Sequence, residues 1–189
     1  MYRLIIFGPP GVGKGTQAQL IAEKLKLFHF STGEVLRVAA ERKTELGLKA
    51  KELMDRGDFV PDDIMIGIVK EALINNSNSN GFILDGFPRT IQQAVALSAM
   101  FKELNYNDVK ILYLKADDEE LIRRLMNRGR SDDNEKSINT RLQIYKNLTA
   151  PILEYFEKNM KVYYINGIGE IEDIKKDISN IFESEINKN

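Results

Sequence analysis

The sequence predicts an α/β protein in which helices cover both faces of a central parallel sheet of about five strands. Short apolar runs at 4–7, 82–85, 110–114 and 161–165 have the length and composition of strands buried on both faces. The longer stretches between these runs carry apolar residues at helical spacing, and a glycine-rich loop directly follows the first run. Such alternation of strands and helices is typical of a parallel sheet between two layers of helices.

The remaining segments follow in chain order. Residues 28–31 (FHFS) are a candidate fifth strand. Residues 31–60 hold helical patterns with no strand run between them, which is too long for a simple connection, so we expect a helical insertion. Residues 127–137 are a short polar and charged segment, and the apolar residues of 171–182 recur at three- and four-residue steps, which predicts a core-facing helix. We therefore expect one domain over 1–189.

The composition argues against several classes of protein. A net charge of −1 provides no positive field that would attract nucleic acid. The chain has no cysteine, so neither a disulfide nor a thiolate zinc site is expected. It reaches the glycine loop within a few residues, which leaves no room for a signal peptide, and no apolar run approaches the roughly 18 residues of a membrane span. We expect a soluble cytoplasmic protein without nucleic-acid or membrane partners.

The glycine loop, GPPGVGKGT at residues 8–16, has the spacing of a phosphate-binding loop from Gly8 to Lys14. Glycines let the backbone N–H groups turn toward a phosphate, and the start of the next helix adds positive charge. The usual hydroxyl after the lysine is replaced by Gly15, and Thr16 arrives one position late. We therefore expect Mg²⁺ to be held by nucleotide oxygens and by water, with Asp85 at the end of a predicted strand orienting that water.

Six arginines are predicted in helices and loops near this site. Guanidinium groups suit phosphate oxygens and keep their charge. No nucleophile or general base accompanies them, because His29, the only histidine, lies in an apolar-aromatic stretch and cysteine is absent. Phosphoryl transfer onto a phosphate needs no base, so the pattern favours phosphate as acceptor as well as donor. The arginines are Arg37, Arg89, Arg124, Arg128, Arg130 and Arg141.

The acidic stretch ADDEE at 116–120 has two interpretations. Four consecutive carboxylates can form part of a metal site, but no other type of ligand accompanies them. Directly before a helical pattern they are better explained as an N-cap with acidic residues that compensate the helix dipole.

Beyond these single features, the chain resembles the adenylate kinases among the nucleoside monophosphate kinases. GPPGVGKGTQA, STGEVLR, DRGDFVPDDI, FILDGFPRTIQQA and GRSDDNEKSINTRLQIY follow one another in the family's order, from Met1 to about Gly169. The resemblance implies a P-loop fold, the reaction ATP + AMP ⇌ 2 ADP with Mg²⁺, and a monomer. It also implies an AMP-binding subdomain at 31–60 and a short lid at 127–137 that has neither the length nor the cysteines of a zinc-binding insert.

The resemblance further implies roles for single residues. ATP phosphates would lie on Gly11, Val12, Gly13, Lys14, Gly15 and Thr16, with Arg124 and Arg128 facing ATP and the backbone of Gly169 at the donor base. The AMP site would comprise Thr32, Arg37, Asp58, Phe59, Val60, Gly86, Arg89 and Gln93. Arg130 and Arg141 would bridge toward AMP and the transferring group, so that the catalytic cations are Lys14, Arg89, Arg124, Arg128, Arg130 and Arg141. Asp85, Asp132 and Asp133 would organise water and charge around the metal and the arginines.

The acceptor base can be argued from two residues. The amide of Gln93 offers one donor and one acceptor, as adenine's edge requires. Thr32 stands where the similar UMP/CMP kinases usually have alanine, and the chain lacks the asparagine that those kinases carry after PR. A UMP/CMP kinase remains the alternative within this class. A GTPase-like switch would need an N-K-x-D stretch and a hydroxyl after Lys14, whereas a non-catalytic binding module would tolerate loss of the catalytic cations.

Overall fold

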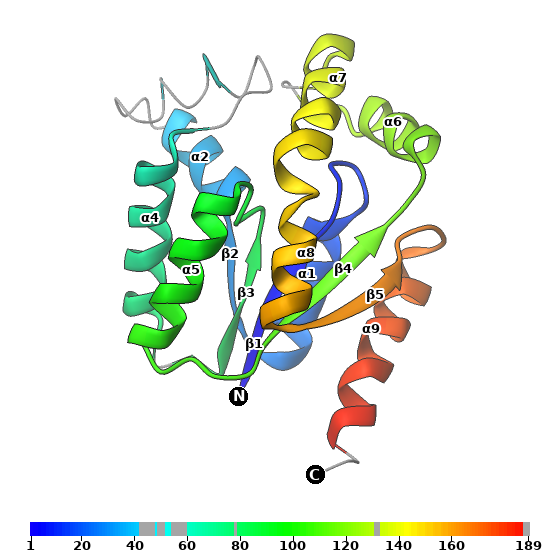
Figure 1. The fold of residues 1–189 in the computed structure, drawn as a ribbon. Coiled ribbons are helices and arrows are strands. Elements are labelled where there is room, and N and C mark those ends of the chain that lie inside the picture. The colour runs from blue at the N-terminus through cyan, green and yellow to red at the C-terminus, as the bar shows by residue number, and fades with distance from the viewer. Residues whose placement is uncertain (42–47, 49–51, 54–59, 78, 131–132, 187–189) are drawn as a thin grey trace.

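A five-stranded parallel sheet forms the centre of the molecule, with strand order β2-β3-β1-β4-β5 (Figure 1). The computed structural model describes residues 1–189 except 42–47, 49–51, 54–59, 78, 131–132 and 187–189. All four predicted apolar runs are strands, and the candidate at 28–31 is the fifth. The strands are β1 (Tyr2–Phe7), β2 (Phe28–Ser31), β3 (Gly81–Asp85), β4 (Val109–Lys115) and β5 (Lys161–Asn166).

Helices cover both faces of this sheet, as predicted (Figure 1). Successive residues of β1 point to opposite sides: Ile5 and Phe7 join a core with α4, α5 and α8, and Leu4 and Ile6 join a core with α1, α6, α7 and α9. Because both faces are apolar, β1 and β3 carry uninterrupted apolar runs in their sequence. The helices are α1 (Lys14–Leu25), α2 (Thr32–Glu41), α4 (Asp62–Asn75), α5 (Ile91–Glu103), α6 (Asp118–Asn127), α7 (Glu135–Ile144), α8 (Ile152–Asn159) and α9 (Ile171–Ile186), with the π-helical turn η1 (Tyr145–Thr149) between α7 and α8.

The strand order places the site. The chain runs from β1 to β2 and β3 on one side of the sheet and then crosses to β4 and β5 on the other. The register pairs Ile6 with Asp85 in β3 and Phe7 with Tyr113 in β4. A parallel sheet opens a crevice beyond the carboxyl ends of its strands where the order reverses, which here lies at the end of β1. The glycine loop and Asp85 therefore meet at this edge.

The acidic stretch at 116–120 caps a helix, as the second interpretation predicted. Asp117 is the N-cap residue of α6, and its side chain accepts a hydrogen bond from the backbone N–H of Glu120 at 2.8 Å. Asp118, Glu119 and Glu120 fill the first turn, where negative charge is favourable. The described residues contain no group of three or more His, Cys, Asp or Glu side chains that could hold a metal ion.

The predicted subdomain at 31–60 and the predicted lid at 127–137 are described only in part. Residues 31–60 begin α2 at Thr32, but most of the segment beyond Glu41 lies outside the described residues. Within 127–137, Arg128, Gly129 and Arg130 follow α6 and Asn134 caps α7, while 131–132 are not described. Their assignment as subdomain and lid stays a prediction. No helix in the described portion of the chain has the length and apolar character needed to cross a membrane.

Candidate active site

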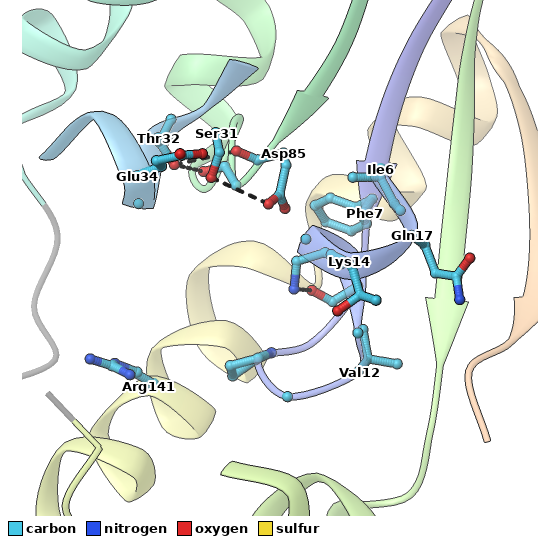
Figure 2. Close-up of a pocket in the computed structure, with 18 of the residues that line it drawn as sticks. Ile6, Phe7, Val12, Lys14, Gln17, Ser31, Thr32, Glu34, Asp85 and Arg141 are labelled. Carbon is cyan, nitrogen blue, oxygen red and sulfur yellow. Dashed lines mark hydrogen bonds between the residues drawn. The ribbon is translucent and has the colours of Figure 1, made fainter. Parts of the chain in front are cut away.

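One cavity of about 820 Å³ lies at the carboxyl edge of the sheet, between the glycine loop, the start of α2 and the arginines of α6 and α7 (Figure 2). All predicted site residues in the described part of the chain line it except Asp133. Asp58, Phe59 and Asp132 are predicted site residues that lie outside the described part of the chain. The lining includes Gly11, Val12, Gly13, Lys14, Gly15, Thr16, Thr32, Arg37, Val60, Asp85, Gly86, Arg89, Gln93, Arg124, Arg128, Arg130, Arg141 and Gly169.

The glycine loop has the backbone that the sequence pattern predicts. Gly11 and Gly13 have φ angles of 87° and 97°, a region that residues with side chains rarely adopt. Gly13 is also the N-cap residue of α1, and it has no side chain that could pair with the first-turn N–H groups. Val12 between them is fully buried and fixes the loop to the core. The N terminus of α1 is thus left open to an anionic ligand.

Lys14 is half-buried and folds back over its own loop. Its Nζ donates hydrogen bonds to the carbonyl oxygens of Gly8 and Pro9, both at 2.8 Å. Burial lowers the pKa of Lys14 from its usual 10.5 to about 8, with Arg89 and Arg128 acting in the same direction and Asp85 opposing them. A phosphate at this position would supply the negative charge that the desolvated ammonium lacks.

Asp85 lies at the end of β3 and faces the loop. Its Oδ2 accepts a hydrogen bond from the hydroxyl of Ser31 at 3.4 Å (Figure 2). A Cβ added to Gly15 would lie 3.4 Å from the same oxygen, so the missing side chain leaves the space beside Asp85 open. One carboxylate and one hydroxyl suit a hydrated Mg²⁺ that is bound chiefly through phosphate oxygens, rather than a metal held by the protein alone.

Asp133 holds two of the predicted catalytic arginines together. Its carboxylate accepts two hydrogen bonds from Arg128, at 2.6 and 2.7 Å, and one from Nη1 of Arg141 at 2.9 Å. The side chain of Asp133 is only 1% exposed. Burial by itself would raise the pKa of Asp133, but the hydrogen bond and charge of Arg128, with those of neighbouring arginines, hold it below its usual value. Two guanidinium groups are thereby placed side by side on an oxyanion.

Arg89 is fixed at its side chain and at both backbone groups. Its Nε donates to the carbonyl of Gly86 at 2.7 Å, its N–H to Oε1 of Gln93 at 2.7 Å, and its carbonyl accepts from the hydroxyl of Thr149 at 2.9 Å. Its Nη2 also lies 3.5 Å from the hydroxyl of Thr32. Burial, with the charges of nearby arginines, lowers the pKa of Arg89, and Asp85 opposes this shift. The guanidinium therefore points into the cavity from a rigid turn.

Arg124 connects α6 to the segment that follows β5. Its Nε donates to the carboxylate of Glu120 at 2.5 Å, and its Nη1 donates to the carbonyl of Gly167 at 2.8 Å. Gly169, predicted at the donor base, lies two residues further on and has a φ of 125°. Arg124 of α6 is therefore bonded to the same loop that carries Gly169.

Three residues of the site were missed from the sequence. Thr149, at the end of the π-helical turn, has no sequence signal beyond its place before Pro151. Asp62 holds the amide of Gln93, but its place at the start of α4 indicates only compensation of the helix dipole. Glu120 could be assigned only to the acidic first turn of α6, and its bond to Arg124 follows from their four-residue spacing.

Comparison with known proteins gives a consistent result. A family model described as adenylate kinase matches residues 6–161. A protein of Leptospira biflexa named adenylate kinase is 47% identical over 182 residues, covering 94% of this chain and 98% of that protein. An adenylate kinase of Flavobacterium psychrophilum is 41% identical, and the match covers 97% of this chain and 100% of that protein. An adenylate kinase of Bacteroides fragilis is 44% identical, and the match covers 94% of this chain and 96% of that protein.

Proposed function

The chain belongs to the adenylate kinase family, and from this premise we propose how its cavity transfers a phosphoryl group from ATP to AMP. The protein is an ATP:AMP phosphotransferase that interconverts ATP + AMP and two ADP, and so maintains the balance of adenine nucleotides. The single observation that supports the mechanism best is the gathering of one lysine and five further cations of the predicted set around one phosphate-binding loop.

We assign the donor site to the glycine loop and α6. The backbone from Gly11 to Thr16 would surround the ATP phosphates, with Lys14 exchanging its two carbonyl partners for phosphate oxygens. Arg124 and Arg128 would contact ATP from α6, and the backbone of Gly169 would lie at the adenine. The loop and α6 both line the cavity and lie against each other at Gly11, which supports this assignment.

We assign the acceptor site to the start of α2 and the turn after β3. Thr32, whose hydroxyl donates to the carbonyl of Gly86 at 3.1 Å, joins these two segments. Arg37 and Arg89 would bind the AMP phosphate, and Gln93 would contact the base. The remaining proposed members are Val60 and the undescribed Asp58 and Phe59, together with Arg130 and Arg141 as the bridge to the donor.

Mg²⁺ bound with ATP would neutralise phosphate charge and polarise the transferring group. Asp85 fits the task of holding a water of that ion, because its carboxylate faces the open space at Gly15. Ser31 keeps the carboxylate in place through its hydroxyl. The protein's own task is to bind both nucleotides in line and to place cations around the charge that develops.

No general base is needed in this scheme, because the attacking AMP phosphate is already ionised. Arg128 and Arg141 would leave Asp133 for phosphate oxygens, which are stronger anionic partners. Because water would compete with AMP, we propose that 31–60 and 127–137 close over the bound nucleotides. Hydrogen exchange with and without a bisubstrate analogue tests this closure, and unchanged exchange in both segments would disprove it.

The first experiment measures ADP formation from ATP and Mg²⁺ with AMP, UMP, CMP or no acceptor. Turnover with AMP alone is expected, and excess EDTA should abolish it. Preference for UMP or CMP would contradict the base assignment, although no observation favours a UMP/CMP kinase. ADP formed without an acceptor would show that the segments at 31–60 and 127–137 fail to exclude water. The cytoplasmic location and the monomeric state stay predictions, and light scattering tests the latter.

A further inference from the structure

The side-chain amide of Gln93 lies at the edge of the cavity between two partners of opposite hydrogen-bonding type. Gln93 is 2% exposed and stands in the first turn of α5. Its Oε1 accepts from the backbone N–H of Arg89 at 2.7 Å, and its Nε2 donates to Oδ1 of Asp62 at 2.6 Å. Each end of the amide therefore makes a short, part-buried hydrogen bond, Oε1 with a backbone N–H and Nε2 with a carboxylate.

These two partners permit only one orientation of the amide. The N–H of Arg89 can only donate, and the Oδ1 of Asp62 accepts from Nε2. Turning the amide over would set Nε2 against the Arg89 N–H and Oε1 against the Asp62 carboxylate. A donor would then face a donor and an acceptor would face an acceptor. Polar groups that lose their hydrogen-bond partners away from water are strongly unfavourable.

Asp62 is itself held in position. Its Oδ2 accepts from the hydroxyl of Thr90 at 2.7 Å, and the same hydroxyl oxygen accepts from the backbone N–H of Gln93 at 3.2 Å as the N-cap of α5. The side chains of Asp62, Thr90 and Gln93, together with the backbone N–H of Gln93, thus form a closed ring of hydrogen bonds between the starts of α4 and α5. The carboxylate cannot move away from Gln93 without breaking the bond to Thr90.

We propose that Asp62 is a specificity-determining residue for the acceptor base, acting by fixing the orientation of the Gln93 amide. The inference rests on the proposed AMP site. The fixed amide keeps one lone pair of Oε1 and one proton of Nε2 for a ligand. Adenine presents an amino group at its 6-position, which donates to Oε1, whereas a 6-oxopurine presents an oxygen that would face Oε1 as a second acceptor. A fixed amide therefore selects adenine over hypoxanthine.

Asp62→Asn should remove this selection without a large change in shape. The Thr90 hydroxyl would still donate to the oxygen of the new amide, which turns the new NH₂ group toward Gln93. That group pairs with Oε1 of the inverted Gln93 amide, while the Arg89 N–H still favours the original orientation. The new amide at position 62 and the Arg89 N–H then favour opposite orientations. The Gln93 amide therefore adopts both orientations, and the inverted one can bind a 6-oxopurine.

The test compares kcat/KM for AMP and IMP in the wild type, Asp62→Asn and Asp63→Asn. Asp63 is the matched control, because it is exposed and lies in the same first turn of α4. We expect the ratio of AMP to IMP to fall about tenfold in Asp62→Asn, as the loss of one charge-assisted hydrogen bond implies. The ratio should not change in Asp63→Asn. The ratio is independent of the fraction of protein that is folded.

Equal losses for AMP and IMP in Asp62→Asn would show that Asp62 is merely structural and would overturn the proposal. Wild-type protein that makes no ADP from ATP and AMP would instead overturn the proposed function itself, and the two failures are therefore distinguishable. NMR of the nucleotide-free wild type provides a readout without any variant. One Nε2 proton of Gln93 should exchange slowly and resonate downfield, and two rapidly exchanging Nε2 protons would refute the fixed orientation.

Discussion

Replacing Lys14 by methionine should strongly lower activity and stabilise the fold when measured near neutral pH. The side chain is half-buried, and its pKa falls from 10.5 to about 8, chiefly because the ammonium is desolvated. At pH 7 the folded protein therefore holds a desolvated ammonium that the unfolded chain would keep in water. Each unit of such a shift corresponds to about 1.4 kcal/mol, so keeping Lys14 charged lowers the free energy of unfolding by about 3 kcal/mol.

The net gain in Lys14→Met is smaller, because the bonds from Nζ to the carbonyls of Gly8 and Pro9 are lost as well. We expect the variant to be more stable by about 1–2 kcal/mol at pH 7. Its kcat/KM should fall by at least about 100-fold, as for the loss of one preorganised cation in a reacting site. Loss of activity together with a gain in stability would indicate that the charge of Lys14 is kept for nucleotide binding at a cost to the stability of the fold.

The pH dependence separates the charge from the lost hydrogen bonds. Between pH 8 and 10.5 the unfolded chain binds a proton at Lys14 that the folded protein has released, so wild-type stability rises with pH in this window. The advantage of the variant should shrink by about 2 kcal/mol between pH 7 and 9.5 in urea denaturation. Lys24→Met, at an exposed position on the same helix, serves as control. A difference between wild type and Lys14→Met that is the same at both pH values would refute the reasoning.

Three further substitutions test other parts of the site. Gly15→Ser should fold with about 0.5 kcal/mol more stability, since a Cβ there meets Asp85 only at an ordinary contact distance; urea denaturation checks it, and a clear loss would contradict the open space. Gly86→Ala should destabilise by about 1–3 kcal/mol and raise KM for AMP, because φ is 81° and the new Cβ would lie 2.5 Å from the Thr32 hydroxyl; a wild-type melting temperature would disprove this. Asp133→Asn should lower the free energy of unfolding by about 2 kcal/mol at neutral pH, where the depressed pKa keeps the carboxylate ionised. The difference from wild type should shrink as the pH falls through that pKa. A difference that does not change with pH would show that the pairing of Asp133 with the arginines contributes nothing to stability.

The sheet and the phosphate loop could be predicted because their signals are local. Strands buried on both faces give uninterrupted apolar runs, and the loop needs glycines and a lysine at set spacings. Even the short strand at 28–31 was found, since Phe28 and Phe30 face one core as the period of a strand requires. The lining of the cavity followed from the family resemblance, which places residues such as Gly169 that no local pattern marks.

The partners that hold the site could not be found in this way, because their roles depend on distant contacts. Asp62 and Gln93 are 31 positions apart, and Thr149 and Arg89 are 60 positions apart. The sequence shows Asp62 as an acidic residue at a helix start and Thr149 as a threonine near a proline. Only the packing of α4 on α5, and the π-helical turn before α8, brings these groups to the site.

Several cations of the site donate hydrogen bonds to oxygens of the chain itself. Lys14 lies on the carbonyls of its own loop, Arg89 on the carbonyl of Gly86, and Arg128 and Arg141 on the carboxylate of Asp133. Under the proposed assignment, a nucleotide would therefore exchange one set of hydrogen bonds for another. Arg128 and Arg141 would both have to leave Asp133 before their guanidinium groups meet phosphate.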